Sequence, residues 1–443
     1  MGKALIVLAG LLLSPAPCAA GEPADQPAMP QEAVEASEPV LPAPSIAAQF
    51  PRTWQATPWM TARLRGRVDT DAIWTSQSPA NETTFGDLGS AVGLRRARLG
   101  LEGSLGDNGR YIAEIDLASG QVIPQDAFVG LGNVQAGGEK RIGHFREPFS
   151  LEGGTSANSF AFMERSPVNM LDPARNWGLG YFGANDDGSR TFAMGVFQAG
   201  TGPGDFQSEP GSTVGFTERI TLAPINSDQG RRLLHLGAAL SERIPEQGVI
   251  ILNQQPQSAL IDFGNSSASP FVPQIAIPAR YQQLINLQCA LARGSFWSQA
   301  EWYSTVISQT NGPAVFYHGC HVDCGYFLTG ENRAYSGENG VFGAVRVNRP
   351  VFRCGAAHGQ PHGWGAWELT ARFAYLDFFD RNTPLGPSGQ LVGVQLSAAT
   401  FGVNWYLADR VRLMFNYSYE MPNEPNTGSS VANIFATRLG IFW

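Results

Sequence analysis

Apolar and charged residues alternate along much of this chain, and this alternation constrains the fold more than any other feature. The same two-residue period returns in residues 60–71, 96–105, 110–118 and 411–419. Successive side chains of a β-strand point to opposite faces, so each segment is predicted to be a strand with one apolar and one polar face. In the first segment, one face carries Met60, Ala62, Leu64, Gly66 and Val68, and the other carries Arg63, Arg65, Arg67 and Asp69.

Two fold classes have strands of this kind, a soluble β-sandwich and a transmembrane β-barrel. Here the polar face carries full charges, several of them in one strand, as the wall of a water-filled lumen does. Aromatic residues also cluster near strand ends, as in the girdles at the two membrane interfaces. These clusters are Trp54 with Trp59, Trp364 with Trp367, and Trp405 with Tyr406. The barrel is therefore predicted, with the sandwich as the alternative.

Composition agrees with a chain that crosses a bilayer by strands. It contains 51 Gly and 11% aromatic residues but only 15% charged residues. No stretch beyond the first twenty residues is long and apolar enough for a membrane helix, and a closed barrel is the other structure that pairs all its backbone groups inside lipid. The last segment, 435–443, ends on an outward-facing Trp443 and resembles the C-terminal signal read by the barrel assembly machinery. We therefore expect the protein in the outer membrane.

Three regions are predicted along the chain. Residues 1–20 read as a secretory signal peptide, with Lys3, an apolar stretch and small residues before a cleavage site after Ala20. Lipidation of Cys18 is the alternative, but Pro17 stands where a small residue is expected. Residues 21–56 are rich in Pro, Ala and Glu and are predicted to be a disordered periplasmic tail.

Residues 57–443 are predicted to form the barrel. The fold class is all-β, an antiparallel up-and-down meander that spans the outer membrane. With strands of about ten residues plus turns and longer loops, the segment fits sixteen strands, with eighteen as the alternative. A barrel of that size encloses an aqueous channel unless something plugs it, and no separate plug domain is recognisable in the sequence.

Basic residues are distributed unevenly, although the net charge of -8 argues against a nucleic-acid partner. Lysine occurs only at positions 3 and 140, so 30 − 2 = 28 basic residues are arginines, which bind oxyanions with a planar fork of donors. Arg63, Arg65 and Arg67 follow one strand and Arg96 and Arg98 a neighbouring one, where Asp69, Asp71 and Glu102 offer few partners. This predicts a positive ladder that guides anions. The alternative is a mixture of charges that merely keeps a wide lumen wet.

Several motifs resemble the phosphate-selective porins of the O and P family. Residues 141–152 (RIGHFREPFSLE), 162–165 (FMER) and 173–180 (PARNWGLG) are similar to that family's G-x-F-[KR]-x-P-F, F-x-E-R and Gly/Asn/Arg turn. Further similar segments lie at 326–333, 363–376 and 404–416, so the resemblance covers most of residues 60–443. It implies a trimeric sixteen-stranded barrel, a loop folded into the pore, and an arginine ladder that leads phosphate or polyphosphate to a constriction.

By matching motif, the resemblance carries Arg67, Arg95, Arg96, Arg146 and Arg165 over as pore-lining. The family also uses lysines beside its arginines, and only Lys140 is available here, so phosphate selectivity is less well supported than anion preference. The predicted anion-binding residues of the pore are Arg63, Arg65, Arg67, Arg95, Arg96, Arg98, Lys140, Arg141, Arg146, Arg165 and Arg175.

Neither catalysis nor a metal is predicted. The sequence contains no G-x-S-x-G and no H-E-x-x-H motif, and the G-x-G-x-x-G match at 178–183 is not followed by a helical pattern. Cys320 and Cys324 share one strand face about 13 Å apart, too far to bridge each other or to chelate one ion. Both are expected to face lipid, as is Cys289. The other candidates considered for a metal site were His318, His321, His358 and His362, and pairing of Cys354 with a loop cysteine remains open.

The predicted function is therefore passive diffusion of small anions, without catalytic residues or cofactors. The first alternative is a general porin for small polar solutes such as sugars, with Trp177, Tyr181 and Trp297 as sliding surfaces. The second is a non-transporting barrel, either an enzyme or a scaffold that tethers the envelope through residues 21–55. The expected partners are a small anionic solute, membrane lipid and lipopolysaccharide, the assembly machinery and two further copies in a homotrimer.

Overall fold

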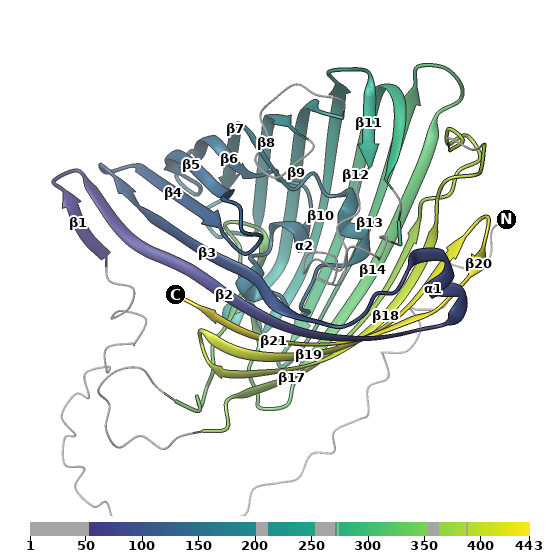
Figure 1. Ribbon diagram of the computed structural model, residues 1–443. Coiled ribbons are helices and arrows are strands. Elements are labelled where there is room, and N and C mark those ends of the chain that lie inside the picture. The colour runs from purple at the N-terminus through teal and green to yellow at the C-terminus, as the bar shows by residue number, and fades with distance from the viewer. Residues whose placement is uncertain (1–52, 201–210, 253–270, 273, 353–362, 387–388) are drawn as a thin grey trace, which may run out of the picture. The chain divides into compact units, whose positions relative to one another are not determined.

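The computed structural model describes residues 53–200, 211–252, 271–272, 274–352, 363–386 and 389–443 (Figure 1). The chain divides into two units, Met1–Pro44 and Ser45–Trp443, and every described residue belongs to the second. The predicted signal peptide and all but the last four residues of the predicted tail lie outside the described residues. Those four are already part of strand β1 (Thr53–Thr57), which pairs with the following strand, so regular structure begins before the predicted boundary at residue 57.

Sixteen antiparallel strands form one closed sheet. Each strand pairs with its neighbours along the chain, and β2 pairs with both β3 and the last strand, β21, which closes the ring. The prediction of a sixteen-stranded barrel is confirmed, and the sandwich and the eighteen-stranded alternatives are wrong. The wall consists of β2 (Met60–Gln77), β3 (Ala91–Leu105), β4 (Gly109–Asp116), β5 (Ile123–Asn133), β6 (Gly138–Arg146), β7 (Arg175–Ala184), β8 (Arg190–Ala199), β9 (Thr213–Ser227), β10 (Arg232–Pro245), β12 (Ile275–Arg293), β13 (Phe296–Gln309), β14 (Val315–Phe327), β17 (Ala366–Asp377), β18 (Gln395–Ala408), β19 (Val411–Glu424) and β21 (Ala432–Phe442).

The remaining elements are short and lie in the connections between wall strands. No helix of the described residues is long and apolar enough to cross a bilayer. The short strands are β11 (Val249–Leu252), β15 (Arg333–Ser336), β16 (Val341–Val345) and β20 (Gly428–Ser429). The helices are α1 (Pro79–Phe85) and α2 (Leu151–Gly154), with single 3₁₀ turns η2 (Ala157–Ser159), η3 (Pro167–Leu171) and η4 (Asp228–Gly230).

The alternation seen in the sequence separates lipid-facing from lumen-facing side chains. Leu99 and Leu101 of β3 and Leu439 of β21 are exposed on the outer face, whereas Arg67 and Asp69 of β2 are buried inside. In a membrane the outer face contacts the hydrocarbon chains of lipid, so its apolar side chains require no polar partners. Trp367 and Trp405 stack with ring centroids 5.0 Å apart where β17 and β18 meet the turns, as expected for an interfacial girdle.

The two ends of the barrel differ in their connections. One end, here called the turn end, has turns as short as residues 106–108, 294–295 and 409–410. The other end, the loop end, has connections as long as residues 147–174 and 378–394. The C-terminal strand β21 finishes at the turn end, where Trp443 pairs with Gly66 of β2.

A segment from the loop end folds into the lumen. This constriction loop, residues 147–174, joins β6 to β7 and carries α2, which lies inside the ring of strands in Figure 1. Its backbone is held by the far wall: the amide of Leu151 donates to Glu301 of β13 at 2.9 Å, and Arg412 of β19 donates to the carbonyl of Phe160 at 2.7 Å. The inward-folded loop that the family resemblance implied is therefore present.

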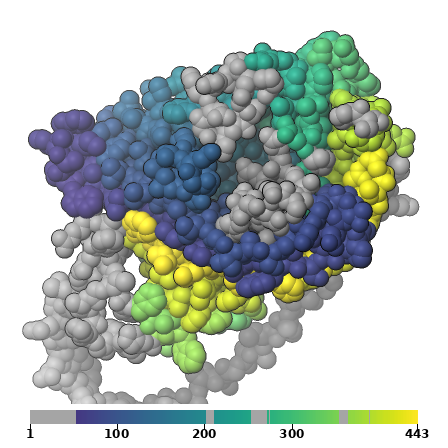
Figure 2. All heavy atoms as spheres, viewed as in Figure 1, coloured from purple at the N-terminus to yellow at the C-terminus, as the bar shows by residue number. Residues whose placement is uncertain are grey.

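A second segment, which was not predicted, enters from the turn end. The connection between β14 and β17 forms a small hairpin of β15 and β16, here called the lumen hairpin, residues 333–345. Arg333 donates to the carbonyl of Ser159 in the constriction loop at 3.1 Å. Buried apolar residues join the two segments to the wall, among them Leu151, Phe162, Trp297 and Phe342. The lumen beside β13, β14 and β17 is thereby packed, and a recess remains beside the first strands, which are purple to blue in Figure 2.

Candidate functional site

The recess contains a cavity of about 410 Å³ between the constriction loop and the wall formed by β2 to β7. Its charged lining consists of ten arginines and three acids, so formal positive charge dominates its surface. The arginines are Arg63, Arg65, Arg67, Arg96, Arg98, Arg110, Arg141, Arg146, Arg165 and Arg175, and the acids are Glu102, Glu114 and Asp126.

Strand alternation places the arginines of β2 and β3 side by side along this wall. Arg65 donates to Glu102 at 2.8 Å and lies 2.7 Å from Glu114, and Arg63 also pairs with Glu102. Arg98 donates to Asp116 at 2.8 Å. The predicted row of guanidinium groups is therefore present, and its arginines have more acid partners than the sequence indicated.

A β-bulge turns two consecutive arginines into the lumen. In the β2–β3 ladder Asp69 faces Arg96 and Thr70 faces Leu94, so Arg95 is the extra residue. Both arginines reach Glu164 of the constriction loop, Arg95 at 2.9 Å and Arg96 at 3.2 Å. Strict alternation predicts only one of them inside; the family motif implied both.

Glu164 ties the constriction loop to the wall. Arg438 of β21 also donates to it, at 2.5 Å, so three guanidinium groups from β3 and β21 converge on one carboxylate. Burial alone would raise the pKa of Glu164, but the positive charges of Arg95, Arg96 and Arg438 outweigh burial and hold this pKa well below its ordinary value. The carboxylate therefore stays ionised and keeps the loop in place.

Arg165 differs from the other arginines of the cavity because no carboxylate of the described residues forms an ion pair with it. It donates to the carbonyl of Gly153 at 3.2 Å and lies over the ring of Phe160 at 4.5 Å, and its buried Nε has no partner. Burial and the nearby charge of Arg146 lower the pKa of Arg165 well below its ordinary value, and the opposite influence of Asp172 and Glu152 does not offset them. A guanidinium remains protonated even so.

Comparison with known proteins identifies the family. A model of the phosphate-selective porin O and P family matches residues 76–436. The chain belongs to this family. It is an outer-membrane porin channel, and the turn end of its barrel is the periplasmic end.

Two known relatives align with most of the chain. An uncharacterized protein of Caulobacter vibrioides is 27% identical over 419 residues, which are 90% of this chain and 77% of that protein. Porin O of Pseudomonas aeruginosa is 24% identical over 404 residues, 85% of this chain and 87% of that protein. The trimer form of OmpT of Vibrio cholerae superposes with a TM-score of 0.50 at 11% identity and covers 87% of this chain and 100% of that chain, which shows a shared fold.

Nine of the eleven predicted site residues line the cavity. Arg95 does not line the cavity and binds Glu164 instead, and Lys140 is on the other side of the wall. Lys140 stands in register with Leu131 and Tyr181 and is exposed on the outer face, because Arg141 takes the inward position. The placement of Lys140 in the pore is thus corrected. The nine are Arg63, Arg65, Arg67, Arg96, Arg98, Arg141, Arg146, Arg165 and Arg175.

Other lumen arginines were absent from the predicted set. Arg110 lines the cavity and donates to Glu139 at 3.0 Å, and strand alternation had already put it on the polar face. Arg372 of β17 lies 2.8 Å from Asp323 and also binds Glu152 of the constriction loop. No local pattern announces a partner more than 200 positions away, so the role of Arg372 as an anchor of the loop is visible only in the fold.

The aromatic residues that a sugar channel would use do not line the cavity. Trp177 and Tyr181 share the outer face with exposed Leu179, and Trp297 is buried and donates to Glu368 at 2.7 Å. Cys289, Cys320 and Cys324 are free and half-buried. Within the described ranges no three His, Cys, Asp or Glu side chains are placed to hold a metal ion, and Cys354, His358 and His362 fall outside those ranges.

Replacing Glu164 by Gln is expected to loosen the constriction loop, because three arginines would lose their shared carboxylate. Breaking a buried pair of this kind costs about 3 kcal/mol of unfolding free energy, measured by urea denaturation in lipid vesicles. The matched control is Glu102→Gln, whose more exposed pairs with Arg63 and Arg65 contribute less than about 1 kcal/mol.

The pH dependence provides a second check on Glu164. Its folded-state pKa is depressed, so its stabilisation is fully present above about pH 4 and is lost as the pH falls through the folded-state pKa. The stability difference between the wild type and Glu164→Gln should accordingly be constant between pH 5 and 8 on this argument. A stability difference that vanishes between pH 5 and 8 would contradict the role of Glu164 in holding the constriction loop.

Proposed function

We propose that this porin favours small anions. The observation that carries the proposal is the lining of the cavity, where ten arginines face three acids in the part of the lumen that the two inward segments leave open. Rings and rows of arginine select anions because they raise the local anion concentration and repel cations.

Pairing with acids does not remove the capacity of these arginines to bind anions. A guanidinium has five N–H donors, and one carboxylate occupies at most two of them in the usual fork geometry. Arg65, for example, still has 26% of its side chain exposed to the cavity while it contacts Glu102 and Glu114. A passing anion can therefore accept hydrogen bonds from successive arginines without displacing their carboxylates.

Phosphate or polyphosphate is the proposed solute, supported by the family match and by the chemistry of arginine. Guanidinium groups bind phosphate oxygens through two parallel hydrogen bonds, so the cavity needs no lysine for this purpose. Arg165 is the strongest candidate contact, since it is buried, lines the cavity and forms no ion pair with a described acid. A weakly selective channel is the second candidate, favoured by the ion pairs that the other cavity arginines form.

A homotrimer is also proposed, because OmpT of Vibrio cholerae shares the fold and is known in a trimer form. Light scattering of the detergent-solubilised porin should give three times the chain mass after correction for detergent. A mass of one chain would contradict this assembly.

Reversing one cavity charge is expected to weaken anion preference. In Arg65→Glu the zero-current potential under a KCl gradient should move toward that of a cation channel, with a roughly threefold fall in the chloride-to-potassium permeability ratio. Lys140→Glu is the control, because it makes the same charge change on the outer face. Equal potentials for the two variants would refute the role of the cavity.

Removing the charge of Arg165 is expected to weaken block by phosphate. Arg165→Gln should raise the phosphate concentration that halves chloride conductance by about tenfold, the value of one charge-assisted bidentate contact. Arg63→Gln, at an exposed position of the same cavity, should raise it less. An unchanged half-blocking concentration in Arg165→Gln would exclude this residue as the phosphate contact.

A further inference from the structure

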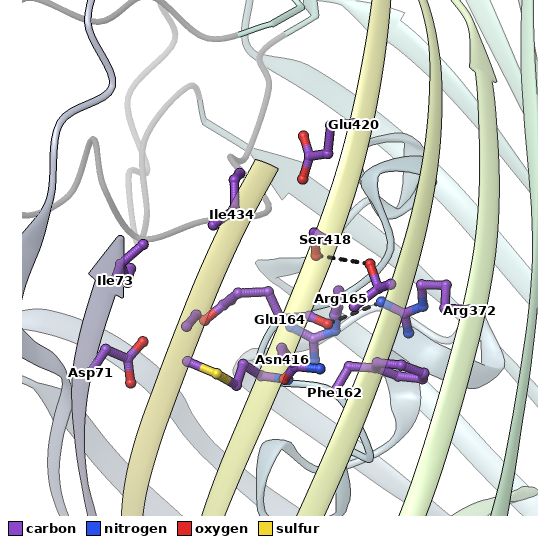
Figure 3. A pocket seen from close by; sticks show the side chains of 13 residues that line it. Asp71, Ile73, Phe162, Glu164, Arg165, Arg372, Asn416, Ser418, Glu420 and Ile434 are labelled. Carbon is purple, nitrogen blue, oxygen red and sulfur yellow. Dashed lines mark hydrogen bonds between the residues drawn. The ribbon is translucent and has the colours of Figure 1, made fainter. Parts of the chain in front are cut away.

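A second, smaller cavity lies on the loop-end side of Arg165, which lines both cavities (Figure 3). Its volume is about 40 Å³, enough for roughly three water molecules. Asp71 comes from β2, Ser418 and Glu420 come from β19, and Glu164 comes from the constriction loop.

Glu420 is the unusual residue of this cavity. It is only 2% exposed, neither of its carboxylate oxygens has a partner among the described residues, and Oε1 is completely enclosed. The other two acids of the lining are compensated, because Arg438 binds both Asp71 and Glu164. A carboxylate buried without a partner is costly, so its position calls for a positively charged or hydrogen-bond-donating occupant.

The arginines of the same cavity do not neutralise Glu420. Arg372 is engaged by Asp323 and Glu152, and Arg165 forms no ion pair with any described carboxylate. The strand places further oxygen ligands below Glu420: the hydroxyl of Ser418 lies 2.9 Å from that of Thr400. The oxygen of Asn416 is occupied by the amide of Met163, which leaves hydroxyl and carboxylate oxygens facing the space.

We propose that this cavity is a binding site for a small monovalent cation, held by the Glu420 carboxylate and the Ser418 and Thr400 hydroxyls. An alkali ion and the primary ammonium group of a solute share this chemistry, since both are bound by hard oxygen ligands. One uncompensated carboxylate suits a single positive charge, whereas Ca²⁺ sites gather several carboxylates. The site borders the proposed anion path at Arg165, which lines both cavities, but binding of a cation to Glu420 does not require that the channel select anions.

Anomalous scattering from crystals of the full-length porin soaked in RbCl tests the site directly. A Rb⁺ peak is expected between Glu420 and Ser418, and it should be absent in Glu420→Gln, which preserves shape but removes the charge. Methylammonium chloride added to the soak should displace the peak if an ammonium group fits, and a peak that persists assigns the site to alkali ions. No peak in the wild type, or equal peaks in both proteins, would overturn the proposal.

Conductance gives a second readout in the assembled protein. Tetraethylammonium is too large for a space of about three waters, so wild-type chloride conductance should be about twofold higher in RbCl than in tetraethylammonium chloride at matched bulk conductivity. Glu420→Gln should lose this cation dependence. Glu424→Gln, which removes the same charge from a half-buried position bonded to Asn426 and Thr427, should retain it.

The heat-modified gel mobility of each variant establishes that its barrel is folded. If Glu420→Gln fails to fold, Ser418→Ala replaces it, with a weaker Rb⁺ peak expected. A cation-favouring zero-current potential with an intact Rb⁺ peak would reject the anion proposal and leave the cation site standing. An anion-favouring zero-current potential without a Rb⁺ peak would reject the cation site and leave the anion proposal standing.

Discussion

Closure of the sheet is the constraint on which the rest of this structure depends. In the hydrocarbon of a bilayer, each unpaired backbone group costs several kcal/mol, so the first strand of the wall must pair with the last. The ladder between β2 and β21 does this and brings Arg438 within reach of Asp71. Closure also forces every second side chain into a common lumen, where charges from strands distant in sequence must find partners.

The partners that lumen charges find on the constriction loop hold this loop inside the barrel and so narrow the lumen. Lumen arginines on β17, β19 and β21 hold the constriction loop by its carbonyls and carboxylates, through Arg372, Arg412 and Arg438. The lumen hairpin packs against the same loop from the periplasmic end. The interior beside β13, β14 and β17 becomes a packed core, and the remaining cavity lies against the β2–β7 wall.

The charges of that space are divided between structure and transport. Arg67, Arg96 and Arg438 are nearly buried and serve mainly to neutralise Asp69, Asp71 and Glu164. Arg63 and Arg65 remain partly exposed, and Arg165 is buried and forms no ion pair within the part of the chain that the structure describes. Net positive charge in the cavity lining thus results from a surplus of arginine over acid, and Arg165 alone among the lining arginines forms no ion pair with a described carboxylate. Glu420 is the acidic counterpart of Arg165, because it too is buried and has no partner in the described ranges.

The sequence by itself determined the barrel, the outer and inner faces of its strands, and nine of the residues that line the cavity. The barrel, its two faces and the arginine row of β2 and β3 follow from local periodicity, because a strand places side chains i and i+2 on one face whatever surrounds it. Arg146 and Arg165 were predicted from the resemblance to the family motifs. Local patterns also located the constriction loop, through a family motif that ends in Glu164 and Arg165. Lys140 was assigned wrongly because its charge was weighed above its position next to inward-facing Arg141. Only the tertiary structure decided which acid neutralises which arginine, that the lumen hairpin packs against the constriction loop, and that Arg165 and Glu420 form no ion pair among the described residues. The pairs Arg372–Glu152 and Arg438–Glu164 join residues more than 200 positions apart, and closure of the barrel, which no local pattern records, brings them together.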